Sequence, residues 1–300
     1  MLYNNLSGYF REKYGKRLKK ICIDGSFSCP NRDGKCGEGG CIFCGERGAG
    51  EHIDATISIR EQVERAIAAE GDDTLFCAYF QNFTNTYDTA ENLKKKYDAA
   101  LISDRIRLLS IGTRPDCIDE KIAELIASYG TRVDVTVELG LQTSCDETAR
   151  IINRGYKTEV FKRAVEILNS YGIPVVVHLI VGLPGENIEN IKRTVEYING
   201  LDIWGIKIHS IYVMRGTRLA EMYEWGKYTP PTLDEYVECA AYIVSHIKPD
   251  MIIHRLTGDC PRDMLIAPDW NTDKGAVIAR INERLATEKL RQGSEYKKEI

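Results

Sequence analysis

Short apolar runs alternate with longer amphipathic segments along most of this chain, and that alternation restricts the folds it can adopt. The runs have the length and the Val, Ile, Leu and aromatic content of buried strands, and the segments between them have helical periodicity. Strands are predicted at residues 21–26, 75–81, 106–113, 133–142, 174–182 and 204–214. Helices are predicted at residues 58–69, 89–101, 119–128, 158–171 and 187–198. Such a pattern predicts an α/β fold with a parallel sheet.

Polar residues recur where the predicted strands end, and this favours a barrel over an open, doubly wound sheet. Sites in barrels are built at the carboxyl ends of the strands. The polar residues at these ends are Gln81, Asn82, Thr113, Arg114 and Gln142. We therefore predict a partial parallel (β/α)6-type TIM barrel over residues 21–214. A basic helical segment, 1–20, precedes it, and a short C-terminal extension, 215–300, packs on it with a possible last strand at 251–256.

The composition argues against two classes of protein. Lys and Arg number 40 against 44 Asp and Glu, a net charge of −4, so the molecule as a whole is not an electrostatic nucleic-acid binder. No run of 18 apolar residues occurs and the first residues do not resemble a signal peptide, so we expect a cytoplasmic protein without membrane contact. Residues 11–20 carry six cations and one acid, which indicates either a solvated face or a phosphate-binding surface.

Cysteines are concentrated in one glycine-rich segment after the first predicted strand. Of the ten in the chain, four fall within 16 residues: Cys29, Cys36, Cys41 and Cys44. Thiolates spaced as in Cys41 and Cys44 can bind one metal centre, with a third ligand from Cys29. A structural zinc site using all four is the alternative. The scattered remainder is expected to pack in apolar surroundings: Cys22, Cys77, Cys117, Cys145, Cys239 and Cys260.

The position of this segment favours an iron-sulfur cluster over zinc. A closed structural zinc site stabilises small modules that lack a core, whereas this loop lies at the mouth of a large predicted barrel. A 4Fe-4S cluster held by three cysteines leaves one iron open, and that iron can chelate the amino and carboxylate groups of S-adenosylmethionine (SAM). One electron then cleaves SAM to a 5′-deoxyadenosyl radical, which abstracts hydrogen from carbon, while the barrel positions the reactants and excludes water.

The chain resembles a known family over residues 9–290. The segments that carry the resemblance are, in order, CPNRDG, GGCIFC, AYFQNFTNTY, VELGLQT, INRGY, HLIVGLPGE, GIKIHSIYVMRGT and RLTGD followed by PR. They are similar to the radical SAM superfamily, in particular the YhcC/YtqA-type family, which is similar to the Elongator catalytic-subunit-like branch. The long spacer between the first cysteine and the final C-x-x-C is typical of that branch.

The resemblance implies roles for residues near the cluster. It implies that the cluster ligands are Cys29, Cys41 and Cys44. Cys36 has no place in this triad. Phe43, between the last two cysteines, is expected near the adenine of SAM. Gln81 and Asn82 stand where the family has a glycine-rich motif that receives the methionine amino group, and this departure leaves backbone carbonyls to do that work.

The later motifs imply further contacts to SAM. Glu138 and Gln142 are expected at the ribose hydroxyls or the amino group, and His178 at the ribose or adenine. Arg154 is expected at the carboxylate, since a guanidinium suits that pairing. Without the resemblance, Glu138 and His178 are equally well interpreted as hydrogen-bonded polar groups of the core.

The catalytic candidates are Lys207, His209 and Tyr212, which alternation along the sixth predicted strand directs toward one face. Ordinary strand residues are the alternative interpretation. The resemblance implies a radical SAM enzyme that modifies the wobble uridine of tRNA at its C5 substituent, with an electron donor such as flavodoxin or ferredoxin. Two alternatives remain open: a radical SAM enzyme acting on a small molecule, and a zinc-stabilised binding protein without catalysis.

Overall fold

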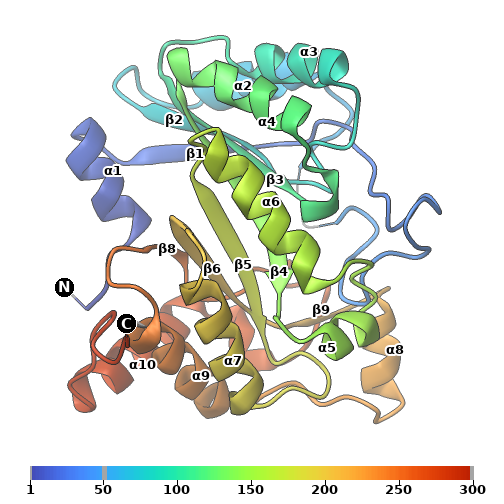
Figure 1. Cartoon of the computed structure of the whole chain (residues 1–300), viewed down its shortest axis with the longest axis vertical. Coiled ribbons are helices and arrows are strands. Elements are labelled where there is room, and N and C mark those ends of the chain that lie inside the picture. The colour runs from blue at the N-terminus through green and yellow to red at the C-terminus, as the bar shows by residue number, and fades with distance from the viewer. Residues whose placement is uncertain (1, 49–52, 298–300) are drawn as a thin grey trace.

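A curled parallel sheet forms the centre of the protein, as the computed structural model shows for residues 2–48 and 53–297 (Figure 1). Its seven strands are hydrogen-bonded in the order β1-β2-β3-β4-β5-β6-β8. Their bounds are β1 Leu18–Ile23, β2 Leu75–Phe80, β3 Ile106–Thr113, β4 Asp134–Gln142, β5 Val175–Val181, β6 Gly205–Ser210 and β8 Ile252–Arg255. Because β1 and β8 are the two edges of this order, the sheet is a partial barrel, as the sequence predicted.

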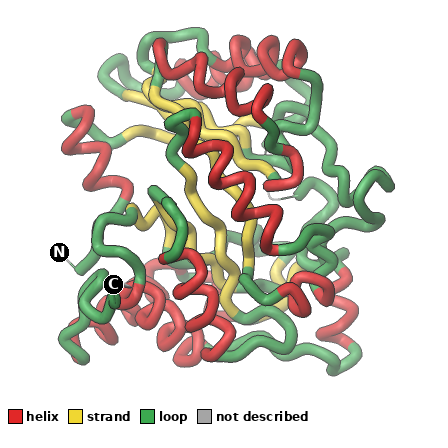
Figure 2. Tube along the Cα trace, in the orientation of Figure 1, coloured by secondary structure: helices red, strands yellow, loops and turns green. Residues whose placement is uncertain are grey.

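Helices cover the outer face of the sheet (Figure 2). They are α2 Ile59–Ala68, α3 Ala90–Ala100, α4 Glu120–Ser128, α6 Thr158–Ser170, α7 Ile188–Asn199 and α9 Leu233–His246. Side chains that accept a hydrogen bond from a backbone amide in the first turn cap several of these helices, for example Ser58, Thr89 and Asp119. The first five match the predicted helices to within a few residues, and α9 belongs to the predicted C-terminal extension. None of the helices in the described ranges has both the length and the apolar content to cross a bilayer.

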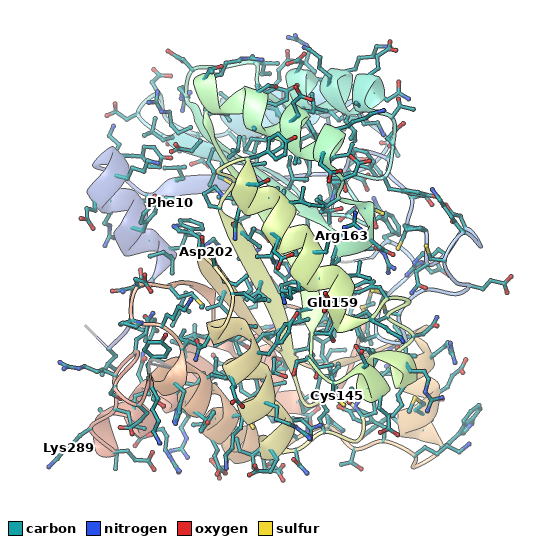
Figure 3. All side chains as sticks on the ribbon, in the orientation of Figure 1. Phe10, Cys145, Glu159, Arg163, Asp202 and Lys289 are labelled. Carbon is teal, nitrogen blue, oxygen red and sulfur yellow. The ribbon has the colours of Figure 1, made fainter. Side chains whose placement is uncertain are left out.

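Alternation along the strands separates an apolar outer face from a polar inner face. In β2, Phe76, Ala78 and Phe80 belong to the large core beneath the helices, whereas Cys77 and Tyr79 belong to a separate inner cluster with Phe10. Figure 3 shows Phe10 on helix α1. Residues on the inner face do not belong to the core beneath the helices, so they can form a functional site.

Helix α1, Leu6–Tyr14, lies at the amino ends of the strands. Asn5, just before it, bridges in parallel to Ile253 of edge strand β8, and Tyr14 hydrogen-bonds with Asp134 at the start of β4. The helix thus covers the end of the barrel opposite the cysteine loop.

The prediction of a helical basic segment over residues 1–20 was wrong at its end. Lys19 and Lys20 belong to strand β1, and Lys16 and Lys19 form ion pairs with Asp73 and Glu70. Since β1 begins at residue 18 and runs toward the cysteine loop, these cations lie at the amino end of the strand and not at the mouth of the barrel.

The sheet continues past residue 214, where the sequence placed the end of the barrel. Strand β8 pairs with β6 in parallel and adds a seventh strand. The predicted strand 204–214 is interrupted after β6, and its last part, β7 Val213–Met214, pairs with β9 Leu265–Ala267. The remaining helices are α5 Asp146–Ile151, α8 Arg218–Glu224 and α10 Lys274–Thr287. The C-terminal segment is therefore partly integrated into the sheet rather than only packed on it.

Candidate active site

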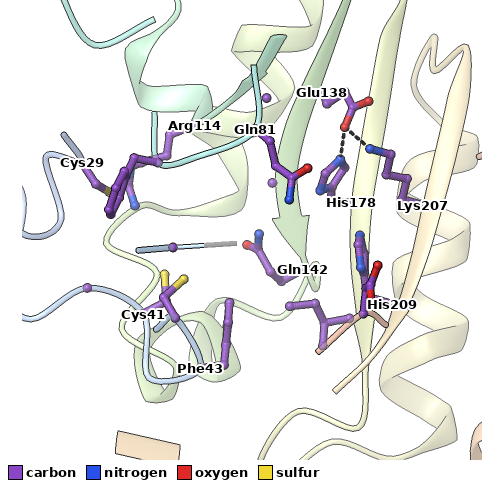
Figure 4. Close-up of a pocket in the computed structure, with 18 of the residues that line it drawn as sticks. Cys29, Cys41, Phe43, Gln81, Arg114, Glu138, Gln142, His178, Lys207 and His209 are labelled. Atoms are coloured by element: carbon purple, nitrogen blue, oxygen red, sulfur yellow. Dashed lines mark hydrogen bonds and ion pairs between the residues drawn. The ribbon is translucent and has the colours of Figure 1, made fainter. Parts of the chain in front are cut away.

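One cavity of about 630 Å³ lies inside the partial barrel, and residues of the cysteine loop form part of its wall (Figure 4). All seven strands of the large sheet contribute to its wall. One residue from each is, in strand order, Cys22, Tyr79, Thr113, Glu138, His178, Lys207 and Arg255. Their side chains converge because they occupy inward-facing positions of neighbouring parallel strands. The volume is in the range of small-molecule and cofactor sites.

Three of the four clustered cysteines line this cavity. Cys29, Cys41 and Cys44 belong to its wall, and the thiols of Cys41 and Cys44 are hydrogen-bonded to each other. Cys36 is exposed and does not belong to the wall. The structure therefore separates the cysteines as the resemblance does, three from one.

Two polar side chains after Cys29 hold the loop in place. Asn31 is fully buried, and its Nδ2 lies 2.6 Å from the carbonyl oxygen of Asn153 and 3.7 Å from the sulfur of Cys41. The guanidinium of Arg32 donates to carbonyl groups of residues 44–46. An amide N–H directed at a ligand sulfur is a common feature around iron-sulfur clusters.

The donor set fits an iron-sulfur cluster with one open iron. It offers three thiols and an N–H to sulfur, and Cys36 is directed elsewhere. Among the described residues, no three His, Cys, Asp or Glu side chains are arranged around a single ion. The fit to a cluster therefore rests on the chemistry of the donors, three thiols and one N–H directed at sulfur, rather than on a preformed metal geometry.

Glu138 is the centre of a buried polar cluster across the cavity from these cysteines (Figure 4). It is 2% exposed, and its carboxylate accepts hydrogen bonds from four side chains. The donors are Tyr79 Oη at 2.8 Å, Ser110 Oγ at 3.0 Å, His178 Nε2 at 2.7 Å and Lys207 Nζ. Burial opposes the charge of Glu138, but the Lys207 charge and the His178 hydrogen bond hold its pKa well below the usual value.

The contacts of Glu138 and His178 bear on their predicted roles at the ribose of SAM. Both line the cavity, but each already has a partner in the other. The interpretation as hydrogen-bonded core groups thus describes the structure, and a contact to SAM remains a prediction for both.

The catalytic candidates all line the cavity, but the alternation predicted from the sequence explains only two of them. Lys207 and His209 alternate on β6, whereas Tyr212 lies beyond the end of that strand and reaches the cavity from the following segment. Lys207 is 3% exposed; burial lowers its pKa to about 7, aided by the charges of Lys20 and Arg255 and opposed by Glu138. Burial also lowers the pKa of His209, whose ring lies 5.2 Å from that of His178.

The predicted SAM contacts divide into two groups. Phe43, Gln81 and Gln142 line the cavity. Gln142 has a positive φ of 60°, and the β4–β5 pairing shifts register at this point, so the strand end turns there. Asn82 is not part of the wall: it is fully buried and donates to Asp24 at 2.6 Å.

Arg154 was expected at the SAM carboxylate, but the structure gives its guanidinium to the backbone. It is 1% exposed, lies outside the cavity wall, and donates to the carbonyls of Leu141, Thr143 and Tyr156 at 2.6 to 3.0 Å. Among the guanidinium groups that do line the cavity is that of Arg114, which forms a bidentate ion pair with Asp116 and lies 4.8 Å from the centre of the Tyr156 ring. Arg114 directly follows strand β3, whereas Arg154 comes after helix α5, and the sequence alone does not show which of the two reaches the cavity.

We expect Arg154→Met to lower the free energy of unfolding by about 3 kcal/mol, because it removes a buried cation and leaves three carbonyl groups without donors. Urea denaturation measures this, with Arg150→Met as the control because Arg150 is exposed on α5. A variant as stable as wild type but weaker in SAM binding would restore the role expected from the sequence.

Several cavity residues were not singled out from the sequence. They are Lys20, Tyr79, Arg255, Cys22 and Cys260, the last two of which were expected only to pack. Lys20 and Cys22 stand two apart on β1, so period-two alternation could have identified that pair. Cys260 belongs to a turn-rich segment whose path only the tertiary structure determines.

Comparisons with known proteins agree with this geometry. The chain matches the Radical SAM superfamily over residues 33–198 and the Radical_SAM C-terminal domain over residues 203–287. It is 36% identical to the uncharacterized protein YtqA of Bacillus subtilis, with 99% of this chain and 93% of YtqA aligned. It is 29% identical to the tRNA uridine(34) acetyltransferase of Methanocaldococcus infernus, over 59% of this chain and 33% of that protein.

A solved structure supports the fold. The archaeal Elp3 of Methanocaldococcus infernus superposes with a TM-score of 0.70 at 20% identity, covering 92% of this chain and 64% of that one. The membership implies SAM and a 4Fe-4S cluster as cofactors, in agreement with the three thiols that line the cavity. From its cysteine loop, its curled parallel sheet and these matches, the chain belongs to the radical SAM superfamily.

Proposed function

We propose that this radical SAM enzyme modifies the wobble uridine of tRNA at its C5 substituent. The observation that carries the proposal is a single cavity with three cysteine thiols on one wall and a buried polar cluster on the other. The partial similarity to the tRNA uridine(34) acetyltransferase supports the choice of substrate. The alternative in the same superfamily is a small-molecule substrate.

Each part of the cavity has a proposed task. Cys29, Cys41 and Cys44 would hold the cluster. Gln81, Gln142 and Phe43 would orient SAM, and Arg114 would pair with its carboxylate. With both groups bound, one-electron chemistry at the cluster allows hydrogen-atom abstraction from carbon. The proposed catalytic group, which faces the substrate, is Lys207, His209 and Tyr212.

The buried polar cluster would keep its part of the cavity rigid. Four donors fix the Glu138 carboxylate, and the carboxylate in turn orients His178 and Lys207. Side chains held in this way lose little entropy when a substrate binds, which helps to position it for reaction. An electron donor such as flavodoxin or ferredoxin would supply the reducing electron, and a cytoplasmic location suits such a partner.

Anaerobic reconstitution with iron and sulfide tests the proposal at its first step. We expect a brown protein that cleaves SAM when reduced, and a change in the C5 substituent of uridine 34 when tRNA is added. A colourless protein that retains zinc and leaves SAM intact would favour the zinc-stabilised binding protein. SAM cleavage without any change in tRNA would favour the small-molecule alternative.

Charge reversal around the mouth should weaken tRNA binding. Lys35 lies on the cysteine loop and Arg262 follows the wall residue Pro261, and both are exposed. Changing both to Glu should reduce affinity and flatten its salt dependence, since each phosphate contact contributes a log-log slope of roughly 0.7 to 0.9. The matched control reverses Arg11 and Arg17, exposed cations near the opposite end of the barrel. Equal losses in both pairs would contradict this orientation of the RNA.

A further inference from the structure

Three cations, Lys20, Lys207 and Arg255, line one part of the cavity wall together with only two carboxylates, Glu138 and Asp259. Lys207 is buried, whereas Lys20 is exposed and the Arg255 side chain is 35% exposed, so solvent reaches two of the three cations. A group of like charges attracts an ion of opposite charge from solution. The contacts of the three cations show which of them pair with a carboxylate.

Lys207 and Lys20 lie against the same aromatic ring. Their Nζ atoms are 4.5 and 4.4 Å from the centre of the Tyr79 ring, so the two ammonium groups are less than 9 Å apart. Lys207 pairs with Glu138, whose carboxylate already accepts four hydrogen bonds. Lys20 forms no ion pair with a carboxylate within residues 2–48 and 53–297. It lies against the Tyr79 ring, and its charge helps to lower the pKa of Glu138.

Arg255 extends this cationic group on the other edge strand. It lies opposite Lys207 in the β6–β8 pairing and 3.9 Å from a carboxylate oxygen of Asp259, which also pairs with Lys274. Lys20 belongs to β1 and Arg255 to β8, the two edges that the sheet leaves unpaired with each other. The charges of all three cations act on the Cys22 thiol, so the three side chains converge on one region of the cavity.

We propose that Lys20, Lys207 and Arg255 bind an oxyanionic group of the substrate, a carboxylate or a phosphate. The proposal rests on the proposed function only in taking this cavity as the substrate site. Both lysine ammoniums and the Arg255 guanidinium donate charge-assisted hydrogen bonds, which suit such a group. A substrate anchored here would extend toward the cysteine wall, where the cluster and SAM would act.

An anion at this place would also change the balance of charge around Lys207. Burial and the neighbouring cations lower the pKa of Lys207 in the free protein. A bound carboxylate or phosphate would favour its protonated form, so binding and protonation would support each other. The site would thereby discriminate against uncharged analogues of the substrate.

Titration calorimetry of the reconstituted enzyme with inorganic phosphate, and separately with acetate, tests the site at constant ionic strength. We expect saturable binding of at least one of them that Lys20→Met weakens about tenfold, the loss of one charge-assisted contact. Arg255→Met should have a similar effect. The matched control is Lys19→Met, because Lys19 neighbours Lys20 on β1, does not line the cavity, and pairs with Glu70.

These experiments test the anion site independently of whether the substrate is tRNA. Absence of anion binding in wild type, or equal effects of Lys19→Met and Lys20→Met, would overturn the proposal whatever the enzyme modifies. If bulk tRNA displaces the bound anion, the oxyanion belongs to a nucleotide. If binding follows the prediction but tRNA does not compete, the site stands and the substrate is a small acid.

Discussion

Replacing any one of Cys29, Cys41 and Cys44 with Ala is expected to abolish assembly of the iron-sulfur cluster and cleavage of SAM. These three thiols line one cavity, and a cluster that loses one of three protein ligands has two left to hold it. Iron and sulfide content after anaerobic reconstitution, together with the absorption of the cluster, measures the effect. SAM cleavage under reducing conditions gives the second measurement.

Cys36→Ala is the matched control for this series. Cys36 belongs to the same loop but is exposed and outside the cavity wall, so we expect the variant to keep most of its iron and activity. Loss of iron from the Cys36 variant as complete as from the Cys29 variant would show that four cysteines bind metal. The zinc alternative would then regain support.

Glu138→Gln is expected to lower the free energy of unfolding by about 3 kcal/mol or more, because it leaves Lys207 buried without a counter-charge. The change keeps the shape of the side chain, so the loss reports on charge and hydrogen bonding rather than on packing. Urea denaturation of the two proteins at neutral pH measures it. Ser110→Ala removes only one neutral donor to the same carboxylate and should cost about 1 kcal/mol.

A double variant distinguishes the charge pair from other effects of the substitution. Adding Lys207→Met to Glu138→Gln removes both charges, and replacing a whole buried pair is often close to neutral. We therefore expect the double variant to recover much of the lost stability. If it is less stable than Glu138→Gln alone, the two residues do not act as a pair.

The difference in unfolding free energy between wild type and Glu138→Gln should depend on pH, because the pKa of Glu138 is lowered. A carboxylate with a folded-state pKa below its unfolded value of about 4.3 stabilises the fold above that pH, and the contribution disappears as pH falls toward the folded pKa. The stability gap between wild type and Glu138→Gln should therefore narrow in acid below this value. A constant gap would indicate that the charge of Glu138 does not cause the loss of stability.

The sequence by itself determined most strands and helices of the sheet and singled out the cysteine loop as the candidate metal site. Strand 106–113 was predicted at the observed bounds of β3, since its apolar run is continuous and flanked by turns. The three cysteines that line the cavity were separated from Cys36 through the family motif. Both are local properties: a strand is encoded in its own alternation, and a ligand loop in its own spacing.

Only the tertiary structure decided which polar side chains share the cavity. Arg114, after strand β3, lines the cavity, whereas Arg154, after helix α5, donates to buried carbonyls. Lys20 and Arg255 are 235 positions apart in the chain and line the same cavity because the sheet curls around it. Sequence patterns record the face of a strand on which a side chain lies. Its partners depend on the order and curvature of the whole sheet, which no single segment contains.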